Sequence, residues 1–152
     1  MRIKDYGLCI IKDKYFLDFP NIRHMDNKYE SRPYFAAIKL DNEIIWLIPL
    51  SSRVDKYKKK MQADIKKYGS SIFYYISKVK GEDKVFLIGN MIPATEEYIK
   101  KPFTVNGKPF VIEDKADIKK IVSKSKRYLK LVRIGKLKPA VDIVEIEAEF
   151  LK

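Results

Sequence analysis

Short apolar runs and stretches of alternating apolar and polar residues predict strands along most of the chain. The strand candidates, each bounded by residues that favour turns, are 6–11, 34–40, 43–50, 71–78, 84–92 and 103–112. The dipeptides Asp41-Asn42 and Asn106-Gly107 predict hairpin turns, the second more strongly. Pro49 and Pro93 lack a ladder donor, so we expect each to mark a strand end or a sheet edge. Residues 14–19 favour a short helix or turn, and residues 21–31 favour a loop.

Two lysine-rich segments have helical periodicity instead. An apolar stripe on the segment 53–67 consists of Val54, Tyr57, Met61 and Ile65, and Gly69 closes the helix. The second segment, 115–138, has an apolar stripe that Ser125 interrupts. Asp114 or Asp117 is its predicted N-cap, and Gly135 is its predicted end.

The tail 142–151 satisfies two patterns at once. Its apolar residues alternate with Glu, which predicts a strand. Asp142 and Glu145, however, have the spacing of a capping box, which predicts a helix. With no repeat and no linker in the 152 residues, we expect one domain over 1–152. The fold class is α+β: a compact, strongly twisted antiparallel sheet with helices packed outside.

Charge is concentrated in the two lysine-rich segments. The net charge is +12; residues 53–67 carry +5, residues 115–138 carry +9, and the remainder sums to −2. A lysine-rich helix is ordinarily just a solvated face. Two helices that hold all the excess predict a polyanionic partner, and nucleic acid is the first candidate.

Other residue types narrow the chemistry. Cys9 is the only cysteine and lies in an apolar run, which favours a buried thiol and a cytoplasmic protein. His24 is the only histidine, so a two-histidine ribonuclease mechanism is excluded. We expect no metal site and no cofactor. The apolar runs are too short for a signal peptide or a membrane span, so no membrane association is expected.

Ser51 and Ser52 follow a buried strand and precede the first basic helix. Either hydroxyl could simply cap that helix. Hydroxyls at a helix N-terminus can also bind phosphate, and Arg53 and Lys56 add positive charge within one turn. Both interpretations stay open from local chemistry alone.

Two longer motifs resemble a known family. Residues 32–40 (RPYFAAIKL) with 45–52 (IWLIPLSS), and later residues 86–93 (FLIGNMIP), are similar to the type III toxin–antitoxin endoribonucleases, the ToxN, AbiQ and CptN group. The resemblance implies a twisted sheet or partial barrel related to the Kid/MazF toxin fold. It also implies a sequence-preferring, metal-independent endoribonuclease that leaves 2′,3′-cyclic phosphate and 5′-hydroxyl ends and arrests growth in phage defence.

The resemblance also implies partners. The inhibitor is a small RNA antitoxin, a pseudoknot that the enzyme cuts from a repeated precursor, and cellular mRNAs are substrates. Protein and RNA form a closed hetero-oligomer with RNA in the active groove.

Site residues carry over one at a time. The resemblance places Ser51 and Ser52 at the paired hydroxyls and Tyr29 at an active-site tyrosine, with Arg32 near a basic position. Val54 occupies the position of the usual lysine, so Arg53 or Lys56 supplies that charge. We expect Ser52 to touch the scissile phosphate or the 2′-OH, and Arg32 to clamp the phosphate. Tyr29 would stack on or orient a base.

The two basic helices are expected to be two walls of one RNA groove with the serine pair at its floor. The residues expected to bind RNA are Lys58, Lys59, Lys60, Lys67, Lys119, Lys124, Lys126, Arg127 and Lys130. Two alternatives remain: a structured-RNA-binding protein that does not cut, and a MazF-like ribonuclease with a protein antitoxin.

Overall fold

The computed structural model describes residues 6–22, 30–40, 42–139 and 141–152. Its strands are β1 Leu8–Ile11, β2 Pro33–Lys39, β3 Ile45–Ser51, β4 Tyr74–Val79, β5 Glu82–Leu87, β6 Ile92–Ala94, β7 Ile99–Pro102, β8 Thr104–Val105 and β9 Lys108–Pro109. Its α-helices are α1 Lys14–Asp18, α2 Val54–Tyr68, α3 Lys115–Arg133 and α4 Ile143–Phe150. Short 3₁₀ turns are η1 Pro20–Ile22, η2 Ile88–Asn90 and η3 Glu96–Tyr98.

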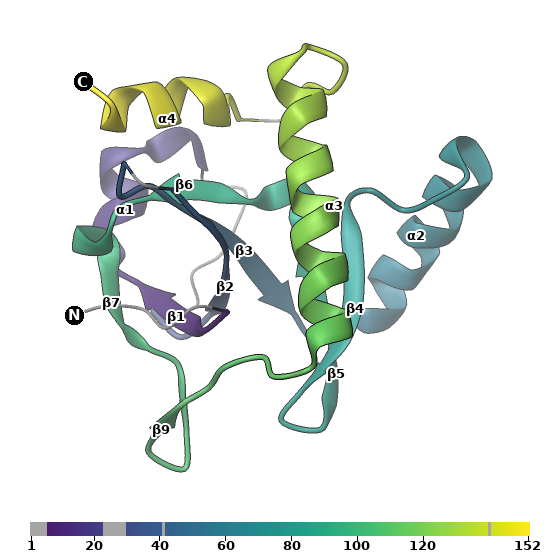
Figure 1. Ribbon diagram of the computed structural model, residues 1–152, viewed down its shortest axis with the longest axis horizontal. Helices are drawn as coiled ribbons and strands as arrows, with labels where there is room; N and C mark the ends of the chain where they lie inside the picture. Colours follow the sequence, from purple (N-terminus) through teal and green to yellow (C-terminus); the bar gives the residue numbers. More distant parts are fainter. Residues whose placement is uncertain (1–5, 23–29, 41, 140) are drawn as a thin grey trace.

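The main sheet is antiparallel, with strand order β4-β5-β3-β2-β1-β7 and with β6 also paired to β3. β4 and β7 lie at its two ends, so the described strands form an open, twisted sheet with helices outside it (Figure 1). The expectation of an antiparallel sheet with outer helices is therefore confirmed. The partial barrel is not closed in the part of the chain that the structure describes.

Two buried clusters occupy the two faces of the sheet. Trp46, Ile48 and Leu50 of β3 belong to the cluster that includes Ile121 and Leu129 of α3. Ile45 and Leu47 of β3 belong to the other cluster, beneath α1 and α4. Successive side chains of a strand point to opposite faces, so this alternation assigns α3 to one face and α1 with α4 to the other.

Local signals at the helix ends predicted the observed boundaries. Asp114 caps α3, since its carboxylate accepts hydrogen bonds from the N–H groups of Ala116 and Asp117 at 2.9 and 3.0 Å. Gly69 and Gly135 follow α2 and α3 in the left-handed conformation, with φ of 83° and 80°. The ambiguous tail is helix α4, and Asp142 is its N-cap, since its carboxylate accepts from the Glu145 N–H at 3.1 Å. The strand alternative is wrong.

The hairpins fold largely as expected. β2 pairs with β3, although Asp41 of the predicted turn lies outside the described residues. Asn106 and Gly107 have positive φ at the β8–β9 turn, as an Asn-Gly hairpin requires.

The prediction of one continuous strand over 84–92 is wrong, because the chain forms β5, the turn η2 and then β6. After β5, the chain turns through η2, where the Gly89 N–H donates to the Phe73 carbonyl oxygen at 3.1 Å. A Cβ at Gly89 would stand only 3.1 Å from the Phe73 ring, so the position favours glycine. The break directs β5 to one end of β3 and β6 to the other.

Pro49 lies within β3 rather than at a strand end, which is a second correction. β6 pairs with Ile45 to Leu47, whereas β5 pairs with Leu50 and Ser51. Pro49 falls in the gap between these pairings, where a missing ladder donor costs nothing. Pro93 lies in the short strand β6, opposite Trp46.

Candidate active site and basic surfaces

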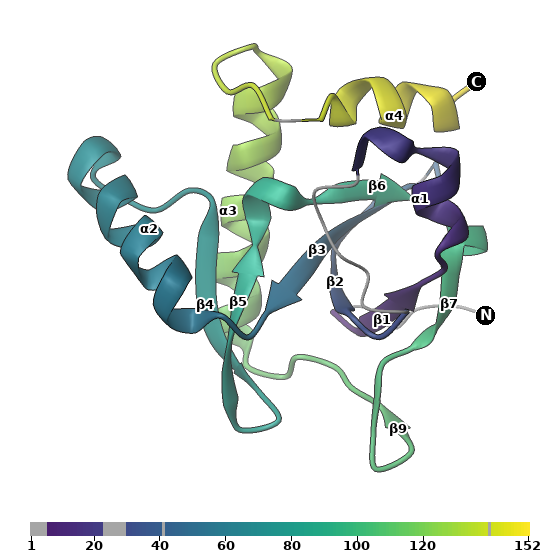
Figure 2. The same ribbon diagram turned by 180° about the vertical axis from the view of Figure 1, so that it is seen from behind.

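The two serines stand where β3 ends and the chain turns into α2 (Figure 2). Ser51 is the last residue of β3, is paired with Val85 of β5 and is 7% exposed. Ser52 lies one residue beyond the strand and is exposed. The strand therefore fixes the first serine, and the second faces solvent.

Arg32 lies beside this pair although it is 19 residues away from Ser51 in sequence. Tyr34 is opposite Pro49 in the β2–β3 register, so continuing the register by two residues puts Arg32 opposite Ser51. Arg32 as a whole residue is 8% exposed, and its Nη1 donates to the Leu50 carbonyl oxygen at 2.6 Å. The structure thus places Arg32 next to the strand end that carries the hydroxyl pair.

Neither serine acts as the helix cap that local chemistry favoured. The N-cap residue of α2 is Arg53, and no side chain of the described residues caps it. Ser51 Oγ instead accepts a hydrogen bond from the Arg53 N–H at 3.2 Å, and the Ser52 carbonyl oxygen accepts from the Val54 N–H at 2.9 Å. The Ser51 hydroxyl and the Ser52 carbonyl therefore both stabilise the turn between β3 and α2.

Arg53 and Lys56 extend the positive charge from the serine pair onto the first turn of α2, where both are exposed. The Lys56 ammonium lies 5.2 Å from the centroid of the Tyr57 ring. That ring also has Lys60 at 5.4 Å and the Tyr74 ring at 5.2 Å. Sequence reasoning missed this aromatic pair; the only local signal was a tyrosine inside a lysine-rich turn.

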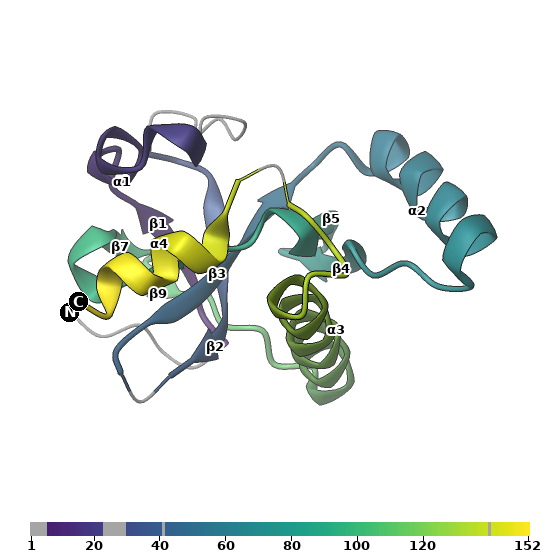
Figure 3. The same ribbon diagram turned by 90° about the horizontal axis from the view of Figure 1, so that it is seen from above.

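The two basic helices lie on opposite faces of the β4–β5 hairpin, which corrects the expectation of two walls facing one groove. Tyr74 of β4 contacts Tyr57 of α2, whereas its neighbour Tyr75 donates from its hydroxyl to Asp117 of α3 at 2.6 Å. Adjacent strand residues point to opposite faces, so the hairpin separates the helices (Figure 3).

α3 and the Ser51 side chain also belong to different faces of β3. Leu50 packs in the cluster beneath α3. By alternation, Ser51 points to the other face. The positive charge of this protein is therefore divided between two surfaces.

Most of the residues expected to bind RNA are exposed. Those of α2 are Lys58, Lys59, Lys60 and Lys67, and those of α3 are Lys119, Lys126, Arg127 and Lys130. Lys124 differs, because its Nζ donates to the Ser71 carbonyl oxygen at 2.6 Å. Burial lowers the pKa of Lys124, and the positive charges of Arg127 and Lys120 lower it further. Lys124 thus connects α3 to the loop after α2.

A second polar cluster, missed by sequence reasoning, joins α3 to β4. The Asp117 carboxylate accepts hydrogen bonds from the Tyr75 hydroxyl at 2.6 Å and the Ser77 hydroxyl at 2.7 Å. These bonds lower the pKa of Asp117. Burial, followed by the bond to Asp117, raises the pKa of Tyr75 to about 12. The sequence carries little signal for this cluster, because Asp117 is 40 or more residues away from both Tyr75 and Ser77.

Tyr29 and His24 lie outside the described residues, so the structure assigns them no place. Within the described ranges, no three His, Cys, Asp or Glu side chains gather as a metal-binding group. No helix in that part of the chain is both long and apolar enough to cross a bilayer.

No protein-family model matches the chain, and no curated protein is significantly similar to it in sequence. The structure is similar to solved proteins of the class that the sequence motifs indicated.

One of these is AbiQ, a lactococcal anti-phage endoribonuclease belonging to the type III toxin–antitoxin system. The TM-score is 0.71 with 17% sequence identity, over 97% of each chain. Another is the ToxN-type protein of a bacterial antiviral system that a processed non-coding RNA regulates. Here the TM-score is 0.66 with 18% identity, over 95% of this chain and 96% of that protein. The similarity establishes a shared fold and confirms the resemblance.

Proposed function

We propose that this chain is a single-domain, sequence-preferring, metal-independent endoribonuclease of a type III toxin–antitoxin system. The observation that carries the proposal is the meeting of Arg32, Ser51 and Ser52 at the β3–α2 junction of this fold. Two neighbours with the same fold over nearly their whole length are an anti-phage endoribonuclease and the protein of an RNA-regulated antiviral system. The implied relationship to the Kid/MazF fold remains part of the proposal.

The RNA supplies its own nucleophile in this reaction. The 2′-OH gives its proton to a solvent water, its oxygen attacks the phosphorus, the bond to the 5′ oxygen breaks, and that oxygen takes a proton from Lys56. The ends are a 2′,3′-cyclic phosphate and a 5′-hydroxyl. The protein has to hold the in-line geometry and stabilise the charged phosphorane.

The contacts at the junction suggest how the residues divide this work. Ser51 Oγ already accepts a bond from the Arg53 N–H, so the exposed Ser52 is the better hydroxyl to touch the scissile phosphate or the 2′-OH. Arg32 is held by the Leu50 carbonyl oxygen and would clamp the phosphate. Arg53 and Lys56 would stabilise the phosphorane, with Lys56 protonating the leaving oxygen. Tyr29 would orient a base.

The biological partners follow the same proposal. The inhibitor is a small pseudoknot RNA cut from a repeated precursor, and cellular mRNAs are the other substrates. Protein and RNA form a closed hetero-oligomer in the cytoplasm, and release of the enzyme arrests growth during phage attack. The basic surfaces on α2 and α3 suit a polyanionic partner, and the neighbour regulated by a processed non-coding RNA favours RNA over a protein antitoxin.

The test is cleavage of cellular RNA in EDTA by the wild type, by Ser52→Ala and by Ser70→Ala. Ser52 lies two residues before α2 and Ser70 two residues after it, so the second variant is a matched control. We expect wild type and Ser70→Ala to leave cyclic phosphate ends, and Ser52→Ala to cut about 100-fold more slowly.

Normal cutting by Ser52→Ala, or a requirement for a divalent metal, would contradict the proposal. RNA that is bound but left intact by the wild type would favour the non-catalytic binding protein instead. Co-purification with an acidic polypeptide rather than RNA would favour the MazF-like alternative. The absorbance ratio of the purified complex separates these two outcomes.

A further inference from the structure

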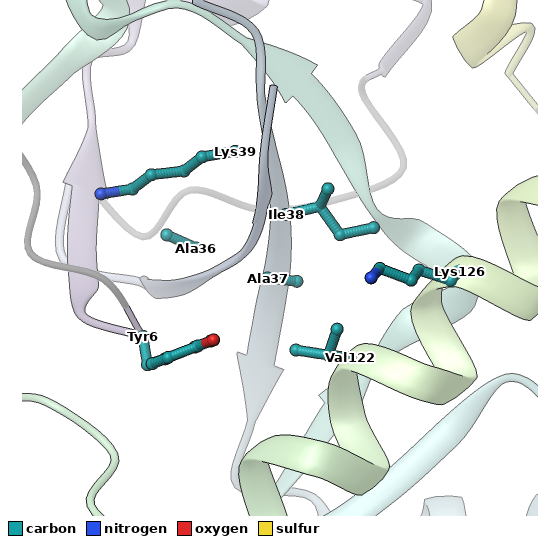
Figure 4. Close-up of a pocket in the computed structure, with 7 residues that line it drawn as sticks. All are labelled: Tyr6, Ala36, Ala37, Ile38, Lys39, Val122 and Lys126. Carbon is teal, nitrogen blue, oxygen red and sulfur yellow. The ribbon is translucent and has the colours of Figure 1, made fainter. Parts of the chain in front are cut away.

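Two adjoining cavities lie between β2 and α3, away from the serine pair. One has a volume of about 260 Å³ and lies against Ala36 and Ala37 of β2. The other, about 570 Å³, runs along α3. They share Tyr6, Val122 and Lys126. Figure 4 shows Val122 and Lys126 projecting from α3 toward Ala37, with the Tyr6 ring beside them. Volumes in this range accept small organic ligands.

Tyr6 presents an aromatic ring to this double cavity. It is 39% exposed, and its inner side stacks on Phe35 with centroids 6.5 Å apart and an interplanar angle of 21°. Its backbone has a φ of 60°, an unusual value for a bulky residue, and its carbonyl oxygen accepts from the Ile112 N–H at 3.0 Å. The fold therefore holds a half-exposed ring in a fixed place.

Apolar side chains and lysines line both cavities together. Ile118 and Val122 supply aliphatic surface from α3, while Lys115, Lys119 and Lys126 surround it. No carboxylate is among the described residues that line either cavity. An aromatic ring next to an aliphatic slot with ammonium groups around it suits a flat base attached to phosphates.

The double cavity is remote from the proposed catalytic junction. Ala36 pairs with Leu47, which is four strand residues, roughly 13 Å, from Ser51. α3 also lies on the face of β3 opposite to that of Ser51, as the alternation of Leu50 and Ser51 requires. A nucleotide in the cavity is therefore not the one being cut.

We propose that the double cavity is an exosite for an unpaired base of a folded RNA, with Tyr6 as the stacking residue and Lys119 and Lys126 on the flanking phosphates. This inference rests on the proposed function only in taking RNA as the partner. The exosite lets a folded RNA that reaches around the edge of the sheet bind more tightly than a short substrate at the serine pair. It adds specificity for the large RNA partner without a part in the chemistry.

The test introduces a carboxylate by Val122→Glu and, as a matched control, by Ile134→Glu. Ile134 follows the same helix, is 56% exposed and lines neither cavity. Affinity is measured in a Ser52→Ala background with a random-sequence pool of 40-nucleotide RNA. We expect Val122→Glu to weaken binding about tenfold relative to Ile134→Glu. With Ser52 intact, both variants should cut a random hexanucleotide pool at the same rate.

A second measurement does not depend on these substitutions. Photocrosslinks from 4-thiouridine in the 40-nucleotide pool should map to peptides that contain Tyr6 or Val122. Tyr6→Phe should keep the affinity and Tyr6→Ala should lose it about tenfold. Equal affinities of Val122→Glu and Ile134→Glu, or crosslinks confined to the β3–α2 junction and α2, would overturn the exosite. Absence of any cleavage by the wild type would instead overturn the proposed function alone.

Discussion

α2 and α3 are both lysine-rich amphipathic helices, but they pack against the sheet differently. α2 has no buried residue, and Ile65 in its apolar stripe is 51% exposed. α3 buries Ile121, Tyr128 and Leu129 beneath its lysines. The serine pair lies just before the first residue of α2. The lysine-lined cavities lie along the side of α3.

The comparison shows that a lysine-rich amphipathic pattern does not by itself say which helix holds the core together. Both stripes satisfy helical periodicity, but only one meets a sheet face that needs covering. The stripe of α2 therefore stays exposed, whereas α3 covers one face of the sheet. Three sets of variants test this difference, beginning with the largest expected effect.

Truncating a side chain in each apolar stripe should lower the free energy of unfolding by very different amounts in the two helices. Leu129→Ala removes buried apolar surface from the core, so we expect it to lower the free energy of unfolding by about 2–5 kcal/mol. Ile65→Ala on the exposed stripe should change it by about 0.5 kcal/mol or less. Urea unfolding measures both, and equal losses would mean that α2 also belongs to the core.

Neutralising lysines should show that both surfaces contact RNA. One variant changes Lys58, Lys59 and Lys60 to Gln, and the other changes Lys119, Lys126 and Lys130 to Gln. Each phosphate contact contributes roughly 0.7 to the slope of log affinity against log salt. Each triple variant should therefore flatten the slope for the 40-nucleotide pool by up to about 2 and weaken binding about tenfold.

Filter binding at several salt concentrations measures these slopes. The two effects should add in a combined variant, because the β4–β5 hairpin separates the surfaces. Lys124 is left unchanged because it holds the Ser71 carbonyl. A slope that the α3 variant leaves unaltered would remove that helix from the RNA interface.

The stability that the hydrogen bonds between Asp117 of α3 and β4 contribute should depend on pH. Hydrogen bonds from Tyr75 and Ser77 lower the pKa of Asp117 in the folded protein. Their stabilisation is present above the unfolded pKa, roughly 3.9, and is lost as the pH falls through the lower folded value. Asp117→Asn should cost about 1 kcal/mol at pH 7.

Urea unfolding at pH 7 and at pH 3 checks the sign. The difference in free energy of unfolding between wild type and Asp117→Asn should be smaller at pH 3 than at pH 7. A gap that widens on acidification would show that the charged carboxylate is not what these hydroxyls stabilise.

Sequence-local signals predicted much of the fold. Asp114 and Gly135 mark the two ends of α3, and Asn106-Gly107 marks a hairpin. These signals act through backbone geometry and caps that involve only nearby residues. The position of the serine pair between β3 and α2 was also predicted, because the sequence pattern itself defines the buried strand and the helix on either side.

The arrangement of the helices was beyond the sequence pattern. The assignment of α2 and α3 to opposite faces depends on which side of β4 Tyr74 and Tyr75 point to, and hence on strand register. The role of Lys124 depends on a carbonyl 53 residues away, and the interruption of β5 depends on the approach of Gly89 to Phe73. Such long-range contacts leave no periodicity in the sequence.

The central claim is that a second RNA-binding surface, which takes no part in cutting, lies on the face of the sheet opposite to Ser51. The most direct measurement determines, side by side, the cleavage rate of the hexanucleotide pool and the affinity for the 40-nucleotide pool. The account predicts that Ser52→Ala loses about 100-fold in cleavage and keeps its affinity, whereas Val122→Glu loses about tenfold in affinity and keeps its cleavage rate. Equal losses of cleavage rate and affinity in Ser52→Ala, or in Val122→Glu, with the variant still folded would contradict it.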